Sequence, residues 1–111
     1  MEKSPLGEFE ELVLLAAHGL GGDAYTVSIQ ERIEQHAGRM AALGAIYTAL
    51  RRLKDKGFLT SEMGPSTPQR GGKRKRMYTV TPSGKEALYL VRQTRNRLWQ
   101  EVSGRPAWIL S

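Results

Sequence analysis

The spacing of the apolar residues changes twice along this chain, first at Gly57 and again at residue 82. Before Gly57 they recur every three or four positions, the period of a helix, and beyond it two short stretches alternate with the period of a strand. From residue 82 the helical spacing returns. The 111 residues must therefore form three helices, two strands and a last helix, and at this length they make one domain.

The first helix is expected to begin near Ser4-Pro5 and to end within residues 19–22, where glycine recurs. Its centre, residues 12–17, is apolar on every face. A helix that is apolar all round is buried either in a large core or against a second subunit. Because the chain is too short for a large core, we expect a subunit interface. The alternative is that Leu14 and Leu15 are both covered within the monomer.

The second helix is expected over residues 26–37, with Ser28 and Glu31 as its capping box and Gly38 as its left-handed cap. A third helix follows, and Gly57 closes it. The residues of these two helices expected to face the core are Val27 or Ile29, Ile33, Ala37, Leu43, Ile46, Leu50 and Leu53.

Two short strands are expected, over residues 58–63 and 77–81. Thr81 then caps a long helix whose first residue is Pro82 and which ends at Gly104. The apolar surface along this helix comprises Leu88, Val91, Leu98 and Val102, with Leu90 and Trp99 beside them.

The charge of the chain is concentrated in one segment. Residues 51–76 hold nine basic and two acidic side chains, a net charge of +7, whereas the whole chain carries +6. The densest part is the sequence RGGKRKR, residues 70–76, between the two expected strands. Charge gathered in this way indicates where a polyanion binds. The alternative is a solvated loop whose charge serves solubility.

Three helices followed by a two-stranded hairpin is the order of a winged helix-turn-helix, so we predict a mainly α fold with a small β-hairpin. In this motif the helix before the hairpin enters the DNA major groove, and the hairpin tip reaches the adjacent backbone or minor groove. For Tyr47 the alternative is a core aromatic with its hydroxyl at the surface. The expected DNA-binding residues are Gly44, Tyr47, Thr48, Arg51 and Arg52 in the third helix and Arg70, Lys73, Arg74, Lys75 and Arg76 in the tip.

Three segments, LGEFEELVLLAA, LGAIYTALRRLKDKGFL and TPQRGGKRKRMYTVTPSGKEAL, resemble the PadR family of bacterial transcriptional regulators. The chain departs from many relatives at Met77, where they carry an aromatic residue. The resemblance implies a homodimeric repressor that binds an imperfect inverted repeat in double-stranded DNA, with the dimer formed by the first and last helices. We divide the chain accordingly into a DNA-binding domain (1–81), a dimerisation helix (82–104) and a tail (105–111).

The resemblance also implies a small aromatic effector. Some short relatives bind flat aromatic drugs at the dimer interface, against a tryptophan of the last helix. Trp99 is the matching residue here, about one helical turn later and so on the same helical face. The alternative is that Trp99 only packs within the interface.

Enzymatic activity is not expected. Glu10 and Glu11 are adjacent, so they point in different directions on a helix, and no Ser/His/Asp set or phosphate-binding loop is evident. With no cysteine, and with His18 and His36 far apart in the sequence, we expect neither a metal site nor a cofactor.

The longest apolar run is too short to cross a bilayer, and the first residues include acids where a signal peptide is basic and apolar. We therefore expect a cytoplasmic protein without a membrane partner. The alternative function is a winged-helix module that binds proteins and does not recognise DNA sequence. Four consecutive cations argue against that alternative, and the lack of aromatic residues among them argues against single-stranded RNA.

Overall fold

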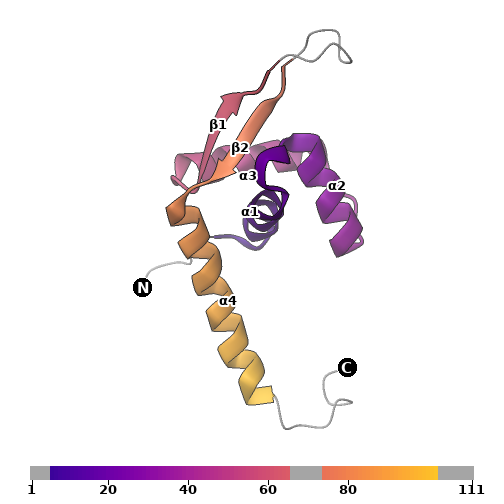
Figure 1. The fold of residues 1–111 in the computed structure, drawn as a ribbon. Coiled ribbons are helices and arrows are strands. Elements are labelled where there is room, and N and C mark those ends of the chain that lie inside the picture. The colour runs from indigo at the N-terminus through magenta and orange to yellow at the C-terminus, as the bar shows by residue number, and fades with distance from the viewer. Residues whose placement is uncertain (1–5, 66–73, 103–111) are drawn as a thin grey trace.

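The computed structural model describes residues 6–65 and 74–102. The elements in chain order are α1 (Glu8–Leu20), a short 3-10 turn η1 (Gly21–Asp23), α2 (Thr26–Ala37), α3 (Leu43–Asp55), β1 (Leu59–Met63), β2 (Arg76–Val80) and α4 (Pro82–Val102). The two strands form one antiparallel hairpin. The predicted fold class, mainly α with a small β-hairpin, is confirmed (Figure 1).

The core lies where the first three helices meet the hairpin. Its most deeply buried large side chains are Val13, Leu14, Ile29, Ile46, Leu50, Leu53 and Leu59. Five expected core positions on α2 and α3 are confirmed, Ile29, Ile33, Ile46, Leu50 and Leu53, but Ala37 and Leu43 are exposed. Ala37 is the last residue of α2 and Leu43 is the first of α3. Of the alternatives Val27 and Ile29, the structure buries Ile29, and Val27 lies on the opposite face of the helix. The spacing of apolar residues in the sequence therefore identified the buried face of each helix, but it did not show at which residue that face begins or ends.

α1 begins at Glu8, later than the predicted start at Ser4-Pro5, because the Gly7 N–H donates to the Glu10 carboxylate (2.9 Å) and closes the first turn. Within the apolar centre of this helix, Leu14 is fully buried whereas Leu15 is 52% exposed. The monomer therefore covers one of these two leucines and leaves the other at the surface.

α2 has the predicted bounds but a different N-terminal cap. Tyr25 is the residue before the helix, and its N–H donates to the Ser28 hydroxyl, which itself donates to the Asp23 carbonyl (2.9 and 2.6 Å). The predicted pairing of Ser28 with Glu31 is wrong, because Ser28 lies inside the first turn. At the other end Gly38 adopts the predicted left-handed conformation, with φ of 66°.

The hairpin pairs Leu59 with Val80 at its base and Met63 with Arg76 toward its tip. β1 starts one residue later than predicted and ends at the predicted residue, whereas β2 starts and ends one residue earlier than predicted. Phe58 stays outside β1 because its N–H donates to Leu53 of α3 and its carbonyl accepts the Thr81 N–H.

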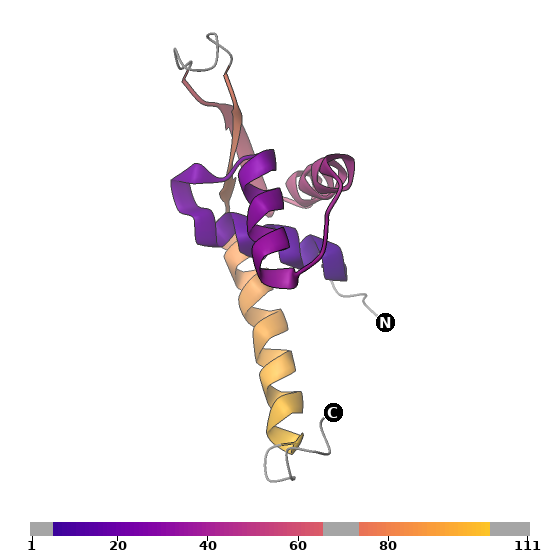
Figure 2. The same cartoon turned by 90° about the vertical axis from the view of Figure 1, so that its right-hand side faces the viewer.

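Thr81 caps α4 as predicted: its hydroxyl accepts the Gly84 N–H (3.1 Å) and donates to the Gly57 carbonyl (2.7 Å). Beyond its first turns, α4 extends away from the other helices (Figures 1 and 2). Of its apolar residues, Leu90, Leu98 and Trp99 are all more than half exposed. No helix among the described residues is long and apolar enough to span a bilayer.

Candidate nucleic-acid interface

α3 presents one face to solvent. All five predicted DNA-binding residues of this helix are exposed: Gly44, Tyr47, Thr48, Arg51 and Arg52. Tyr47 is 54% exposed, so it is not the core aromatic of the alternative interpretation. A Cβ on Gly44 would meet no other atom within 4 Å, which leaves the first turn of α3 open to an approaching surface.

The start of α3 is fixed to α2 and its end to α1. The Gln30 amide of α2 donates to the carbonyl of Ala41, which is buried just before α3 (2.7 Å). After the last turn of α3, the Lys56 ammonium binds the Glu10 carboxylate of α1 (2.7 Å). These two contacts set the orientation of the exposed face.

Glu10, which binds Lys56 at the end of α3, is a buried acid. Burial acts to raise the pKa of Glu10, but the Gly7 N–H, Lys56 and the nearby Arg52 outweigh it and hold that pKa below its ordinary value. Glu10 therefore stays ionised. Its negative charge offsets that of Lys56 and part of that of Arg52, at the edge of the exposed face of α3.

Three of the predicted basic residues, Arg74, Lys75 and Arg76, lie on the described part of the hairpin. Arg76 donates to the Ser61 hydroxyl across the hairpin (3.2 Å). Arg74 donates to the carbonyls of Gly64 and Met63 (2.7 and 3.1 Å), and the Lys75 ammonium lies 3.8 Å from the centre of the Tyr25 ring. The other predicted cations of the tip, Arg70 and Lys73, lie outside the described residues.

Strand β2 is also bound to the start of α2. The Tyr78 N–H donates to the Ala24 carbonyl (2.9 Å), and the buried Tyr78 side chain interacts with Thr26. Burial raises the pKa of Tyr78, so its phenol is neutral. The base of the hairpin is thereby held at a fixed place beside α3.

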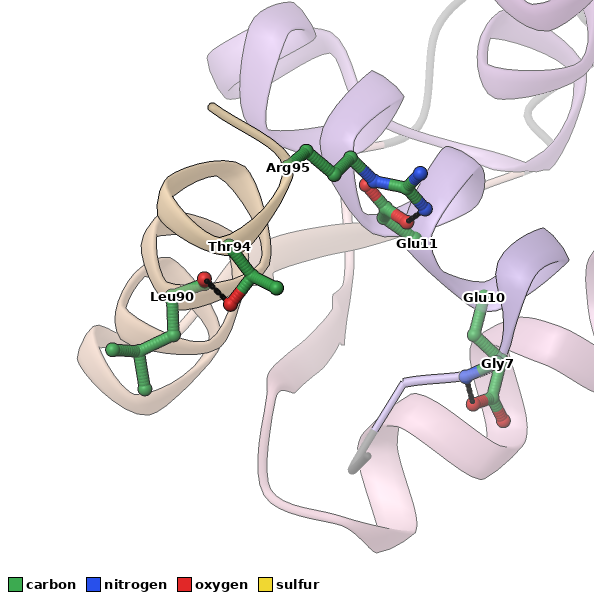
Figure 3. A network of polar contacts seen from close by, with 6 residues as sticks. All are labelled: Gly7, Glu10, Glu11, Leu90, Thr94 and Arg95. Atoms are coloured by element: carbon green, nitrogen blue, oxygen red, sulfur yellow. Dashed lines mark hydrogen bonds and ion pairs between the residues drawn. The ribbon is translucent and has the colours of Figure 1, made fainter. Parts of the chain in front are cut away.

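A second concave surface, a groove of about 660 Å³, lies between α1 and α4. Trp99, 59% exposed, lines it together with Leu15 and Tyr89. Across it the Arg95 guanidinium donates to the Glu11 carboxylate (2.8 Å), and this hydrogen bond raises the pKa of Arg95 (Figure 3). The groove is thus lined by aromatic rings and by the Arg95–Glu11 ion pair.

The two histidines, distant in sequence, line one groove between α1 and α2. His18 and His36 stand beside Leu12 and Ile33 there. Among the described residues no third His, Cys, Asp or Glu joins them in a group that could hold a metal ion.

The family model of the Transcriptional regulator PadR-like family matches residues 14–89. This chain belongs to the PadR-like family. The matched residues run from α1 through the hairpin into α4 and so contain all the DNA-binding residues predicted above. The family is one of transcriptional regulators, as the sequence motifs implied. None of the curated proteins matches the chain in sequence.

Solved structures of PadR-like proteins share this fold. A PadR-like transcription factor from Bacteroides fragilis is 24% identical, with a TM-score of 0.72 over 88% of this chain and 89% of that one. A PadR family regulator from Clostridium difficile is 22% identical, with a TM-score of 0.69 over 89% and 97%. The Bacillus subtilis PadR in complex with operator DNA is 26% identical, with a TM-score of 0.61 over 73% of this chain and 44% of that chain.

Sequence reasoning did not find the residues that position this PadR-like interface. Glu10 and Lys56, and likewise Tyr25 and Lys75, are far apart in the chain, and no periodic pattern connects them. Gln30 also carried no signal, because an exposed glutamine on a helix is common. The pairing of β2 with the start of α2 places Lys75 against Tyr25, and that pairing is a property of the folded chain.

Proposed function

We propose that this PadR-like protein is a transcriptional repressor that binds double-stranded DNA sequence-specifically, as a homodimer on an inverted-repeat operator. The observation that carries the proposal is the exposed face of α3 standing beside a hairpin rich in cations. The relative from Bacillus subtilis bound to operator DNA gives it support.

In this proposal α3 reads the major groove. Gly44 lets the helix approach the groove floor, and Tyr47 and Thr48 donate hydrogen bonds to phosphates or base edges. Arg51 and Arg52 bind guanine or phosphate. Sequence choice resides in this helix.

The hairpin is the wing, and its cations bind the phosphate backbone. Five residues are assigned to this role: Arg70, Lys73, Arg74, Lys75 and Arg76. Contacts of this kind contribute affinity for every sequence and make it dependent on salt.

The proposed dimerisation segment is residues 82–104, which contains α4 (Pro82–Val102), beside the DNA-binding domain of residues 1–81. The exposed Leu15 of α1 and the exposed Tyr89 and Trp99 of α4 line one groove, an apolar surface that a second copy would bury. A two-fold dimer presents two copies of α3 to half-sites one helical turn apart. The tail, residues 105–111, lies outside the described residues.

A small aromatic effector that releases the DNA is the proposed regulator, bound in the α1–α4 groove against Trp99. Titration of flat aromatic acids into a Trp108→Phe variant should quench the emission of Trp99. A ligand that releases DNA but leaves this emission unchanged would contradict the assignment.

The proposal excludes catalysis, a metal and a cofactor, and it places the protein in the cytoplasm. It is supported by membership of a family of transcriptional regulators. A protein-binding winged helix is the alternative, but such a module has no need of cations on both α3 and the wing.

DNA binding is tested by fluorescence anisotropy with duplexes that contain an inverted repeat from the intergenic region next to the gene. We expect one duplex to bind at least about a thousandfold more tightly than unrelated duplexes. Arg51→Ala should reduce this preference, whereas Arg76→Gln should weaken binding to all duplexes and lower the salt slope by about one. Absence of duplex binding at low salt would refute the proposal.

A further inference from the structure

Arg74 makes more contacts within the chain than any other cation described in the wing. Its Nε donates to the Gly64 carbonyl (2.7 Å) and its Nη2 to the Met63 carbonyl (3.1 Å). These are consecutive carbonyls at the end of β1, where the ladder with β2 stops. A planar guanidinium that serves two adjacent acceptors has its orientation fixed, which a lysine ammonium cannot reproduce.

At Gly64, just past the end of β1, the two arms of the wing lie in close contact. Its N–H donates to the Lys75 carbonyl (2.6 Å), and the residue is buried. A Cβ at this position would lie 3.0 Å from Met77 Cγ and 3.3 Å from the Lys75 oxygen. The arms therefore depend on Gly64 and on the two bonds from Arg74 to stay together past the end of the ladder.

Lys75 connects this part of the hairpin to Tyr25, the residue before α2. Its ammonium lies over the Tyr25 ring at 3.8 Å, a distance typical of a cation–π contact. Tyr25 is the residue that precedes α2, and its neighbour Ala24 accepts the N–H of Tyr78 in β2. Through these contacts the wing is held against the helix-turn-helix.

We propose that Arg74 and Lys75 are positioning residues, which hold the wing at a fixed angle, and that Arg76 binds phosphate directly. This rests on the proposed function and revises one part of it, because Arg74 and Lys75 are no longer counted among the cations that bind phosphate. Arg76 makes one longer bond, to an exposed serine hydroxyl, and keeps its remaining donors for a ligand. Residues 74–76 thus serve two purposes, positioning of the wing and binding of phosphate, and the charge of the residues does not reveal which one each serves.

The test uses variants that keep the charge. Arg74→Lys removes the planar fork, Tyr25→Leu removes the ring beneath Lys75, and Arg76→Lys is the matched control. The first measurement is hydrogen exchange of the Gly64 amide by NMR in the free protein. We expect exchange to be about three- to tenfold faster in Arg74→Lys, as loss of hydrogen bonds of ordinary strength implies, and unchanged in Arg76→Lys.

The second measurement is duplex binding as a function of salt. Arg74→Lys and Tyr25→Leu should bind several-fold more weakly with an unchanged salt slope, because no phosphate contact is lost, whereas Arg76→Gln should lower the slope by about one. Wild-type exchange at Gly64 and wild-type affinity in Arg74→Lys would overturn the proposal. If wild-type protein binds no duplex, the proposed function fails, and Gly64 exchange still decides whether Arg74 holds the wing.

Discussion

Two neighbouring acids of α1, Glu10 and Glu11, act in different places. As their adjacency in the sequence predicts, they point in different directions (Figure 3). Glu10 turns toward α3, where its buried carboxylate meets the ammonium of the more exposed Lys56, whereas Glu11 turns toward α4 and meets the exposed Arg95. The two carboxylates therefore lie in different environments, and the more buried one is expected to contribute more to the free energy of unfolding.

Glu10→Gln should destabilise the protein by about 1 kcal/mol at pH 7, since the amide keeps the shape of the side chain but gives up its charge beside Lys56 and Arg52. Because the pKa of Glu10 is lowered by folding, its contribution is present above the ordinary value of 4.5 and is lost as pH falls through the folded-state pKa. The difference from wild type should therefore shrink below about pH 4.5.

Urea unfolding at a series of pH values measures this difference. Glu11→Gln is the matched control, and it should show a much smaller loss at every pH, because its partner Arg95 is exposed to screening solvent. A Glu10→Gln effect that persists undiminished at pH 3 would mean that packing, and not charge, is what Glu10 contributes.

At the scale of elements, the positions of the helices and strands can be predicted from nearby residues in the sequence. The contacts between these elements cannot. Gly38 and Gly57 have positive φ, as their positions at the ends of apolar repeats predicted. The exposure of Leu43 could not be predicted in the same way, because a repeat identifies a face and does not reveal whether a neighbour reaches its first residue. The two bonds of Arg74 depend on where the hairpin closes, which its basic character does not encode.

The junction of the hairpin with α4 determines where that helix points. Thr81 binds the Gly57 carbonyl through its hydroxyl and the Phe58 carbonyl through its N–H. Gly84, buried in the first turn of α4, lies so close to this junction that a Cβ would overlap the Phe58 carbonyl oxygen and lie 2.9 Å from Val80 Cγ1. The glycine is required by this close approach of helix and backbone.

Gly84→Ala should accordingly destabilise the protein by about 1–3 kcal/mol, because the added methyl group must displace backbone. This is opposite to the usual gain for alanine over glycine inside a helix. Thermal unfolding of Gly84→Ala beside Ser83→Ala, an exposed position in the same turn, separates packing from helix propensity. A Gly84→Ala protein as stable as wild type would show that the junction can open.

At the scale of the whole molecule, the fold has a buried core at one end and an exposed apolar helix at the other. The core covers the first part of α4, where Ala87 and Leu88 are buried. Further along, Tyr89, Leu90, Leu98 and Trp99 have between 54% and 60% of their surface exposed. Of these residues, Leu98 and Trp99 line one shallow groove together with Val102, and apolar exposure of this kind usually marks an interaction surface.

If α4 and the exposed Leu15 meet a second copy, one charge in that surface should separate the subunits. Leu98→Asp places an unpaired carboxylate where the apolar face would be buried, and so it should shift the protein to the mass of a single chain at micromolar concentration, measured by sedimentation equilibrium. Gln100→Asp adds the same charge on another face of α4 and should leave the assembly intact.

The folded monomer of Leu98→Asp should bind a full inverted repeat little better than a half-site, because it can no longer engage both half-sites together. A wild-type chain that sediments as a monomer would contradict this, and the exposed face of α4 would then need another partner.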